Sequence, residues 1–275
     1  MGIIAIPEGL QTKLCVLGDN VLKDVPENVK KLWPGKTAVI IADENTWKAA
    51  GEKVSQLLKD AGIPQAEPYI FPIEPALHAD YCYIPKLREI VKGKAPIAVG
   101  SGTINDLTKL SSTEAECDGY LCVATAASVD GYTSYGAAMV VNGFKKTVPC
   151  AAPLAIIADN AVVSSAPFEM TASGYADLAA KVPGGADWLI ADALGEHPID
   201  ERAWGMVQTN LKEWLSDPQS LKEGKSKPLS DLFQGLAATV AGMIRKRYTC
   251  LDMLYELDYL DTMLDTVFSK GYFQL

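Results

Sequence analysis

The sequence predicts an α/β protein in which a mostly parallel sheet is followed by an all-helical region. Short apolar runs that end in small or acidic residues recur through the first 160 residues. Stretches with the periodicity of an amphipathic helix separate several of these runs. After Asp159 the strand signals disappear and helical stretches dominate. We therefore expect two domains, at residues 1–160 and 161–275.

Five apolar runs are the candidate strands of the sheet. They lie at residues 13–17, 37–42, 97–99, 121–124 and 154–158. None alternates strictly between apolar and polar residues, which is typical of strands covered on both faces, as in parallel sheets. Helical stretches are predicted at 47–61, before the stop signals Gly62 and Pro64, and at 80–92. This alternation of strand and helix implies right-handed crossovers and a doubly wound, Rossmann-like sheet.

One segment of the first half departs from this alternation. Residues 136–149 are predicted to form two strands around Asn142-Gly143, because this dipeptide favours a two-residue hairpin turn. In the second half, Pro167 opens a helical segment that Pro183-Gly184-Gly185 is expected to interrupt. Further helices are predicted at 200–216, 229–248 and 251–268, with a solvated loop at 216–228. A cleft between two such halves is a common place for a ligand.

The composition restricts the possible classes of protein. The 275 residues are 48% hydrophobic and 21% charged, as in an ordinary globular protein. The net charge of −9 argues against a nucleic acid as the main partner. No apolar run approaches the roughly 20 residues of a membrane span, and the start lacks the basic stretch of a signal peptide. The six cysteines form no CxxC pair, which indicates reduced thiols. We therefore expect a cytoplasmic protein without a membrane span.

A glycine-containing segment follows the strand at 97–99 and opens a helix. Gly100 and Gly102 permit conformations and close approaches that a Cβ atom would block. From Thr103 onward, the unpaired N–H groups of the helix N-terminus would suit a pyrophosphate. The spacing is not GxGxxG, so a glycine turn that merely joins strand and helix is the alternative.

A second polar segment follows the strand at 121–124. Thr125, Ser128 and Ser134 supply hydroxyl groups there, and Asp130 supplies a carboxylate. Open α/β sheets bind their ligands at the carboxyl ends of such strands. A polar loop with capping residues is the alternative.

A third candidate is Asp177, which lies among small apolar residues of a predicted helix. Helix interiors do not favour Asp, so a metal ion or a substrate hydroxyl would explain its presence. A carboxylate that simply faces solvent is the alternative.

These three segments, in this order and at these separations, resemble the sn-glycerol-1-phosphate dehydrogenase family. Its superfamily also holds glycerol dehydrogenase, iron-containing alcohol dehydrogenases and 3-dehydroquinate synthase. The resemblance depends on the Ser-x-Asp-Gly segment at 128–131 together with the Gly-Tyr-x-Asp-Leu segment at 174–178. The strand and acid at 40–45, the hairpin and the strand end at Ala158-Asp159 fit the same pattern. The similarity covers roughly residues 10–240.

The resemblance implies that dihydroxyacetone phosphate is reduced to glycerol 1-phosphate with NAD or NADP as cofactor. A divalent metal, usually zinc, would polarise the ketone while the cofactor delivers hydride. Asp130 and Asp177 would be the catalytic residues, and Asp177 would also bind the metal. The implied cofactor contacts are Gly100, Gly102, Thr103, Ile104, Asn105, Asp106, Thr125, Ala126, Ala127, Ser128 and Ser134. Asp43, at a strand end, could favour a free ribose hydroxyl, as in NAD.

The histidines depart from the family pattern. A catalytic zinc normally has three protein ligands, and the family takes two of them from histidines downstream of the aspartate. This chain contains only His78 and His197, and neither occupies a matching motif. We expect the segment with both histidines to be absent between about residues 242 and 247, which would shorten the helical domain. Other acidic residues available as ligands are Asp252, Glu256, Asp258 and Asp261, although a solvated helix face is the favoured interpretation.

Two alternatives therefore accompany the dehydrogenase prediction. A catalytically silent homologue would keep the nucleotide site without the metal. An enzyme like 3-dehydroquinate synthase would share the fold, NAD and the metal, but it fits the segment at 128–131 less well. The expected partner is a small phosphorylated polyol or ketone. A shortened helical domain would also expose apolar surface, which favours a homo-oligomer.

Overall fold

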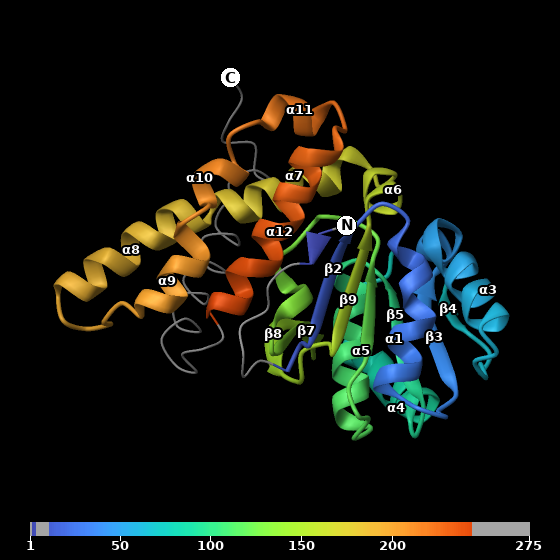
Figure 1. The fold of residues 1–275 in the computed structure, drawn as a ribbon. Coiled ribbons are helices and arrows are strands. Elements are labelled where there is room, and N and C mark those ends of the chain that lie inside the picture. Colours follow the sequence, from blue (N-terminus) through green and yellow to red (C-terminus); the bar gives the residue numbers. More distant parts are fainter. Residues whose placement is uncertain (1, 4–10, 244–275) are drawn as a thin grey trace.

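A seven-stranded sheet forms the centre of the protein in a computed structural model that describes residues 2–3 and 11–243 (Figure 1). Its strand order is β1-β2-β9-β6-β5-β3-β4. The strands are β1 Gly2–Ile3, β2 Leu14–Gly18, β3 Ala38–Asp43, β4 Tyr69–Phe71, β5 Ala95–Gly100, β6 Leu121–Ala124 and β9 Ala155–Asp159. β1 runs antiparallel to β2, and all the other pairs are parallel. The predicted α/β class and the five predicted strands are confirmed.

The register brings the ends of the central strands to one edge of the sheet. Gly100 of β5 pairs with Ala124 of β6, and Ala124 pairs with Ala158 of β9. Because these three strands are parallel, they all end at the same carboxyl edge of the sheet. This edge is where open α/β sheets place their ligands.

Helices cover both faces of the sheet, because strand residues alternate between two apolar cores. Within β5, Ala98 faces one core and Ile97 faces the other. On the face of Ala98 lie η3 Tyr81–Tyr83, α4 Ile84–Val91 and α5 Gly102–Glu114. On the face of Ile97 lie η1 Val21–Asp24, α1 Val25–Leu32, η2 Trp47–Gly51 and α3 Glu52–Asp60, and the short α2 Glu44–Thr46 leads directly into η2. The doubly wound arrangement is as predicted.

The predicted hairpin is confirmed, with strands β7 Gly136–Val141 and β8 Phe144–Pro149. Asn142 and Gly143 both have positive φ, 53° and 81°, as a type I′ turn requires. The main-chain N–H of Val140 donates to the Ala79 carbonyl (2.7 Å), which joins the hairpin to the segment before η3.

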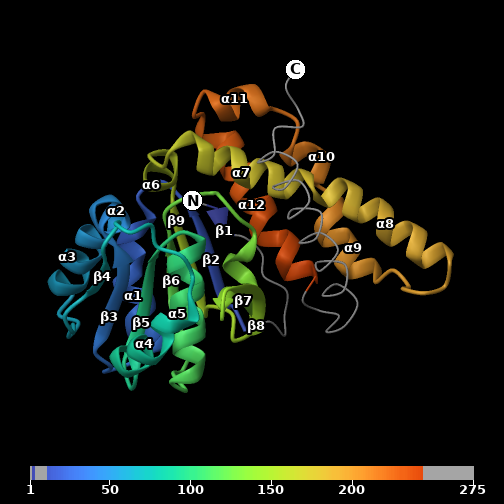
Figure 2. The same cartoon turned by 180° about the vertical axis from the view of Figure 1, so that it is seen from behind.

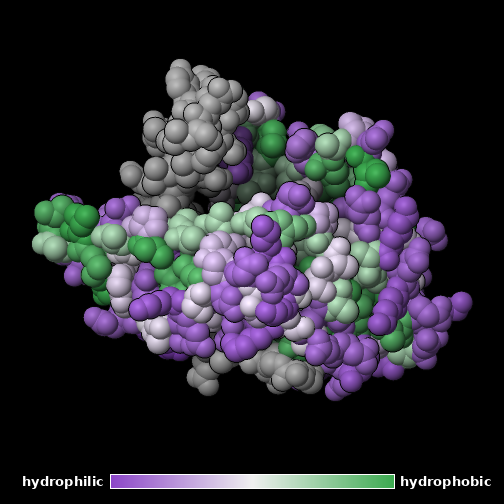
Figure 3. Space-filling view, turned by 90° about the horizontal axis from the view of Figure 1, so that it is seen from above, coloured by the Kyte–Doolittle hydropathy of each residue, from purple (hydrophilic) through white to green (hydrophobic). Residues whose placement is uncertain are grey.

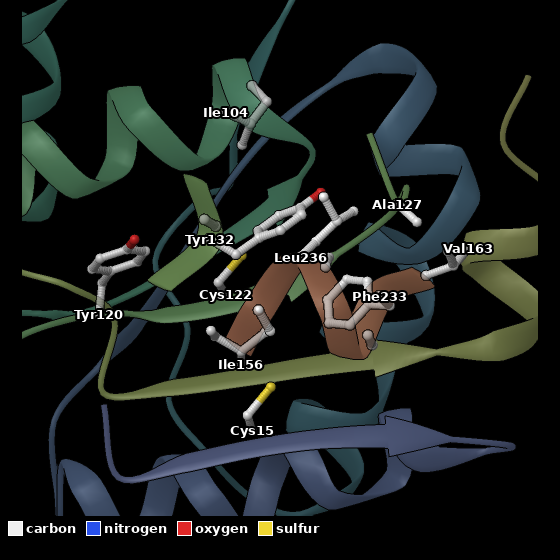
Figure 4. Close-up of a cluster of buried hydrophobic side chains, with 14 of the residues drawn as sticks. Cys15, Ile104, Tyr120, Cys122, Ala127, Tyr132, Ile156, Val163, Phe233 and Leu236 are labelled. Carbon is white, nitrogen blue, oxygen red and sulfur yellow. The ribbon is translucent and has the colours of Figure 1, made fainter. Parts of the chain in front are cut away.

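The second half of the described chain is helical, as predicted (Figure 2). Its helices are α6 Asn160–Ser164, α7 Phe168–Ala179, α8 Lys181–Ala193, α9 Glu201–Gln208, α10 Leu211–Trp214, α11 Pro218–Lys222 and α12 Ser226–Met243. Helix α12 returns to the sheet half. Its Phe233 and Leu236 pack in the same core as Cys15, Tyr132 and Ile156 (Figure 4). Residues on both sides of position 160 thus share one core, and the predicted domain division at that position stays a prediction.

Two local predictions about the helical half are wrong. Pro183-Gly184-Gly185 does not interrupt a helix but lies in the first turn of α8, where the missing proline N–H has no intrahelical partner to lose. The interruption comes earlier, at Ala180 between α7 and α8. The stretch 216–228 is not only a loop, because Asp217 caps α11 by accepting from the Ser220 N–H (3.0 Å). Leu221 of α11 is buried, which fixes this polar helix to the core.

Other predictions concern the surface and the thiols. The described cysteines, at 15, 82, 117, 122 and 150, are free. Among the helices that the structure describes, none is both long enough and apolar enough to cross a bilayer. Exposed apolar side chains gather along α8 at Val182, Leu189 and Ile190 and directly after it at Leu194, and Figure 3 shows green apolar atoms at this end of the molecule. The predicted homo-oligomer stays a prediction.

Candidate functional site

The start of α5 is placed by the strand before it. Gly100 ends β5, and a Cβ atom there would lie 2.5 Å from Cβ of Ile104. Only glycine therefore lets α5 begin directly above the strand end, with Ile104 buried beneath it. The Thr125 N–H donates to the Gly100 carbonyl (3.2 Å), so the loop after β6 lies beside this turn.

The N-terminus of α5 has the features of an anion site. Ser101 is the N-cap residue, but its side chain makes no capping hydrogen bond. Gly102 and Thr103, at the first positions of the helix, are partly exposed. The nearest atom to a Cβ built at Gly102 is Cγ2 of Val129, at 3.4 Å, so the approach is open. N–H groups and the positive end of the helix dipole at such a place suit a phosphate.

Three of the predicted cofactor contacts, Asn105, Asp106 and Ser134, form hydrogen bonds within the protein. Asn105 is buried, and its Oδ1 accepts from the Tyr120 hydroxyl (2.8 Å). Oδ2 of Asp106 accepts from the Ala138 N–H of the hairpin (3.0 Å). The Ser134 hydroxyl accepts from Nζ of Lys109 (2.7 Å). The structure uses these side chains to hold local elements together, and their role toward a cofactor stays a prediction.

The sequence analysis missed Lys109, whose side chain is fully buried. Its ammonium donates to the carbonyls of Gly131 and Gly136 (2.9 Å each) and lies 3.3 Å from Oδ1 of Asp106. This lysine ties α5 to the segment 131–136, from η4 Gly131–Thr133 to the start of β7. Burial raises the pKa of Asp106, and the charge of Lys109 opposes that rise.

The loop after β6 is fixed from two sides. The residues at 125–128 are buried, and the Tyr132 hydroxyl donates to the Ala126 carbonyl (2.7 Å). Helix α7 lies so close that a Cβ atom at Gly174 would collide with the carbonyl oxygen of Ala127. This contact brings α7 against the loop and places Asp177, one turn further on, beside Asp130.

Asp130 and Asp177 meet at this contact, together with Lys181 from the first position of α8. The Asp130 N–H donates to Oδ2 of Asp177 (2.8 Å). Nζ of Lys181 lies 2.7 Å from Oδ2 of Asp130 and 3.1 Å from Oδ1 of Asp177. The lysine side chain is 5% exposed, against 17% and 29% for the two carboxylates. We call these three residues the acid–lysine cluster.

The charges of the acid–lysine cluster influence one another. Burial raises the pKa of Asp177, the charge of Asp130 raises it further, and Lys181 opposes both effects. Burial alone would lower the pKa of Lys181, but the negative charges of Asp130 and Asp177 raise it above its ordinary value. Lys181 is therefore a charged ammonium at neutral pH. The sequence signal for it was its position four residues after Asp177, a spacing that places two residues on one face of a continuous helix.

The predicted ribose contact, Asp43, lies at the end of β3 and caps α2. Its Oδ1 accepts from the N–H groups of Asn45 (2.9 Å) and Thr46 (2.8 Å). The Thr46 hydroxyl in turn accepts a hydrogen bond from the Asp43 N–H (3.0 Å), which completes a capping box. Asp43 shares the carboxyl edge of the sheet with Gly100, and its role toward a ribose stays a prediction.

The donor set for a divalent metal is incomplete in the part of the chain that the structure describes. No group of three His, Cys, Asp or Glu side chains there has the arrangement of a metal site. His78 is exposed between β4 and η3, and His197 follows the end of α8. The four acidic residues considered as further ligands, at 252–261, lie outside the described residues. The described residues do not fit the zinc site that the resemblance implies.

Comparison with known proteins gives a consistent result. The sequence profile described as iron-containing alcohol dehydrogenase matches residues 16–167. A protein of Bacillus velezensis called glycerol-1-phosphate dehydrogenase [NAD(P)+] is 32% identical over 243 residues, which are 86% of this chain and 59% of that protein. A Halalkalibacterium halodurans protein of the same name is 36% identical over 203 residues, 71% of this chain and 49% of its own. The chain thus spans about half to three-fifths of the length of these relatives.

A solved structure shows the same fold. The crystal structure of a probable glycerol dehydrogenase from Sinorhizobium meliloti superposes with a TM-score of 0.66 at 15% identity. The match covers 88% of this chain and 67% of that one.

Proposed function

The chain belongs to the iron-containing alcohol dehydrogenase family, and from this premise we propose that it is an NAD(P)-dependent oxidoreductase of the glycerol-1-phosphate dehydrogenase type. The observation that carries the proposal is the juxtaposition of two features at the carboxyl edge of the sheet. The open N-terminus of α5 lies beside the loop after β6, and Asp130 of that loop bonds to Asp177.

The residues present fit a nicotinamide dinucleotide. The N–H groups at Gly102 and Thr103 would hold its pyrophosphate, and a bound nicotinamide supplies or accepts the hydride that interconverts a ketone and an alcohol. Asp130 and Asp177 retain partly exposed carboxylates, which would accept hydrogen bonds from substrate hydroxyls. Such contacts favour a small polyol or its ketone, such as dihydroxyacetone phosphate.

The dinucleotide site is tested by binding of NADH and NADPH to the full chain, measured by isothermal titration calorimetry. Gly102→Asp adds a carboxylate at the first helical position, where the helix tolerates Asp and the space admits its Cβ. We expect this variant to fold and to bind at least about tenfold more weakly, because its charge repels the pyrophosphate. Gly102→Ala adds the same Cβ without the charge and should retain most of the affinity. Absence of binding by the unaltered chain, or equal binding by the Asp variant, would contradict the proposal.

A second candidate function follows from the incomplete metal donor set among the described residues. A homologue that binds the dinucleotide without turning over substrate would keep the α5 site and lose the chemistry. Oxidation of NADH with dihydroxyacetone phosphate, followed with and without added zinc chloride, separates the two. Turnover supports the dehydrogenase, and binding without turnover under both conditions supports the silent homologue.

A further inference from the structure

The acid–lysine cluster places a cation, the Lys181 ammonium, beside Asp177, the residue that the family resemblance implies as a metal ligand. Both oxygens of Asp177 are engaged, one by the Asp130 N–H and one by the Lys181 ammonium. The same ammonium lies 2.7 Å from Oδ2 of Asp130. Lys181 thus forms an ion pair with one carboxylate oxygen of each acidic residue.

The position of Lys181 is fixed by its surroundings. Its side chain is 5% exposed, so its stem is enclosed. Its own carbonyl accepts from Nε2 of Gln208 on α9 (3.0 Å). A Cβ atom at Gly185, one turn along α8, would collide with the same Gln208 amide, so α8 and α9 are in close contact. Lys181 therefore contacts the loop after β6 through Asp130, helix α7 through Asp177 and helix α9 through Gln208, and these contacts fix its position.

A divalent ion at these carboxylates would conflict with this ammonium. It would have to displace a buried lysine from two ion pairs or share the same two oxygens with it. Displacement would leave a buried ammonium without its partners, and sharing would bring like charges together, both of which are costly. No third donor of the His, Cys, Asp or Glu type joins the cluster among the described residues.

We propose that the Lys181 ammonium is the resident cation of the Asp130–Asp177 pair, and that this pair therefore binds no divalent metal. The lysine neutralises one of the two negative charges and leaves a net charge of about −1 at the cluster. The proposal contradicts the metal role that the resemblance implies for Asp177. It does not depend on the proposed function, because it concerns the occupant of the pair and not turnover.

The first test measures metal content. The full chain, purified without chelator, is analysed by mass spectrometry for bound metals, and its melting temperature is compared with added zinc chloride and with EDTA. We expect far less than one metal ion per chain and the same melting temperature in all three conditions. Stoichiometric zinc that is lost in Asp177→Asn would overturn the proposal, whichever residues complete its ligand set.

The second test is a double-mutant cycle on the two members that α7 and α8 contribute. Lys181→Met removes the cation and leaves two facing carboxylates, so it should be destabilising. Asp177→Asn in addition should restore part of the loss, because it removes one of the repelling charges. Lys181→Arg, which keeps the charge, should be less harmful than Lys181→Met. Additive effects of the two substitutions, with Lys181→Arg as harmful as Lys181→Met, would overturn the proposal even if no metal were found.

Lys212→Met serves as the matched control, since Lys212 is exposed on α10. It should leave the melting temperature unchanged. If Lys181→Met does not fold, Lys181→Gln takes its place in the cycle. Binding of NADH is measured in parallel, so that failure of the dinucleotide site and failure of this inference are seen separately.

Discussion

Among the described residues two lysines are buried, Lys109 in α5 and Lys181 in α8, and their surroundings differ. Lys109 donates to two main-chain carbonyls and a hydroxyl, with one carboxylate at 3.3 Å. Lys181 instead lies between two carboxylates that are partly exposed. Lys109 therefore stabilises the segment 131–136, whereas Lys181 determines the net charge of a partly exposed pair of carboxylates. Burial is common to both lysines, so it does not distinguish a structural role from an electrostatic one. The acceptors distinguish them: main-chain carbonyls for Lys109 and carboxylates for Lys181.

The largest effect is expected at the structural lysine. Lys109→Met removes a fully buried ammonium, so the Asp106 carboxylate loses its counter-charge and the carbonyls of Gly131 and Gly136 each lose one donor. It should lower the free energy of unfolding by about 3–5 kcal/mol. Urea denaturation measures this change, with Lys146→Met on the exposed strand β8 as the control. The comparison of the two lysines fails if Lys109→Met costs no more than Lys181→Met.

A smaller effect is expected where α7 contacts the loop after β6. In Gly174→Ala the new Cβ would collide with the Ala127 carbonyl, so the helix must shift. We expect a loss of about 1–3 kcal/mol in unfolding free energy, together with weaker NADH binding, because the acid–lysine cluster is displaced. Gly205→Ala in α9 is the control, since its Cβ would meet nothing nearer than 3.8 Å. That control should be neutral or gain about 0.5–1 kcal/mol, as alanine favours a helix. Equal behaviour of the two variants would contradict the close contact.

The smallest effect concerns pH and sharpens the account of the Lys109 region. Burial raises the pKa of Asp106 above its ordinary 3.8, so the folded chain holds this proton to higher pH than the unfolded chain does. Its contribution to stability is therefore present at low pH and is lost as the pH rises through the folded pKa. Urea denaturation at a series of pH values above 3.8 should show a less negative slope of stability against pH in Asp106→Asn. Identical slopes would mean that the pKa of Asp106 is not raised.

The sheet was predictable because its signals are local. Apolar runs such as 121–124 and the turn dipeptide Asn142-Gly143 carry their structure in adjacent residues, and both predictions are confirmed. The resemblance to the dehydrogenase superfamily is confirmed as well. Strand β4, of three residues at the sheet edge, and helix α1 were not predicted, since short elements leave little periodicity.

The missed parts of the site depend on contacts between distant residues. Lys109 has acceptors 22 to 27 positions away, so a helical pattern cannot reveal its burial. Asp130 and Asp177 were each singled out from the sequence, but their direct bond across 47 positions requires the fold. Lys181 was not singled out from the sequence: its spacing from Asp177 is a local signal, but its second partner, Asp130, is known only from the tertiary structure.

A crystal structure of the full chain with NADH tests the central claim most directly. The account predicts the pyrophosphate against the N–H groups of Gly102 and Thr103, and the Lys181 ammonium still between Asp130 and Asp177. A dinucleotide bound elsewhere, or a metal ion in place of the ammonium, would contradict it.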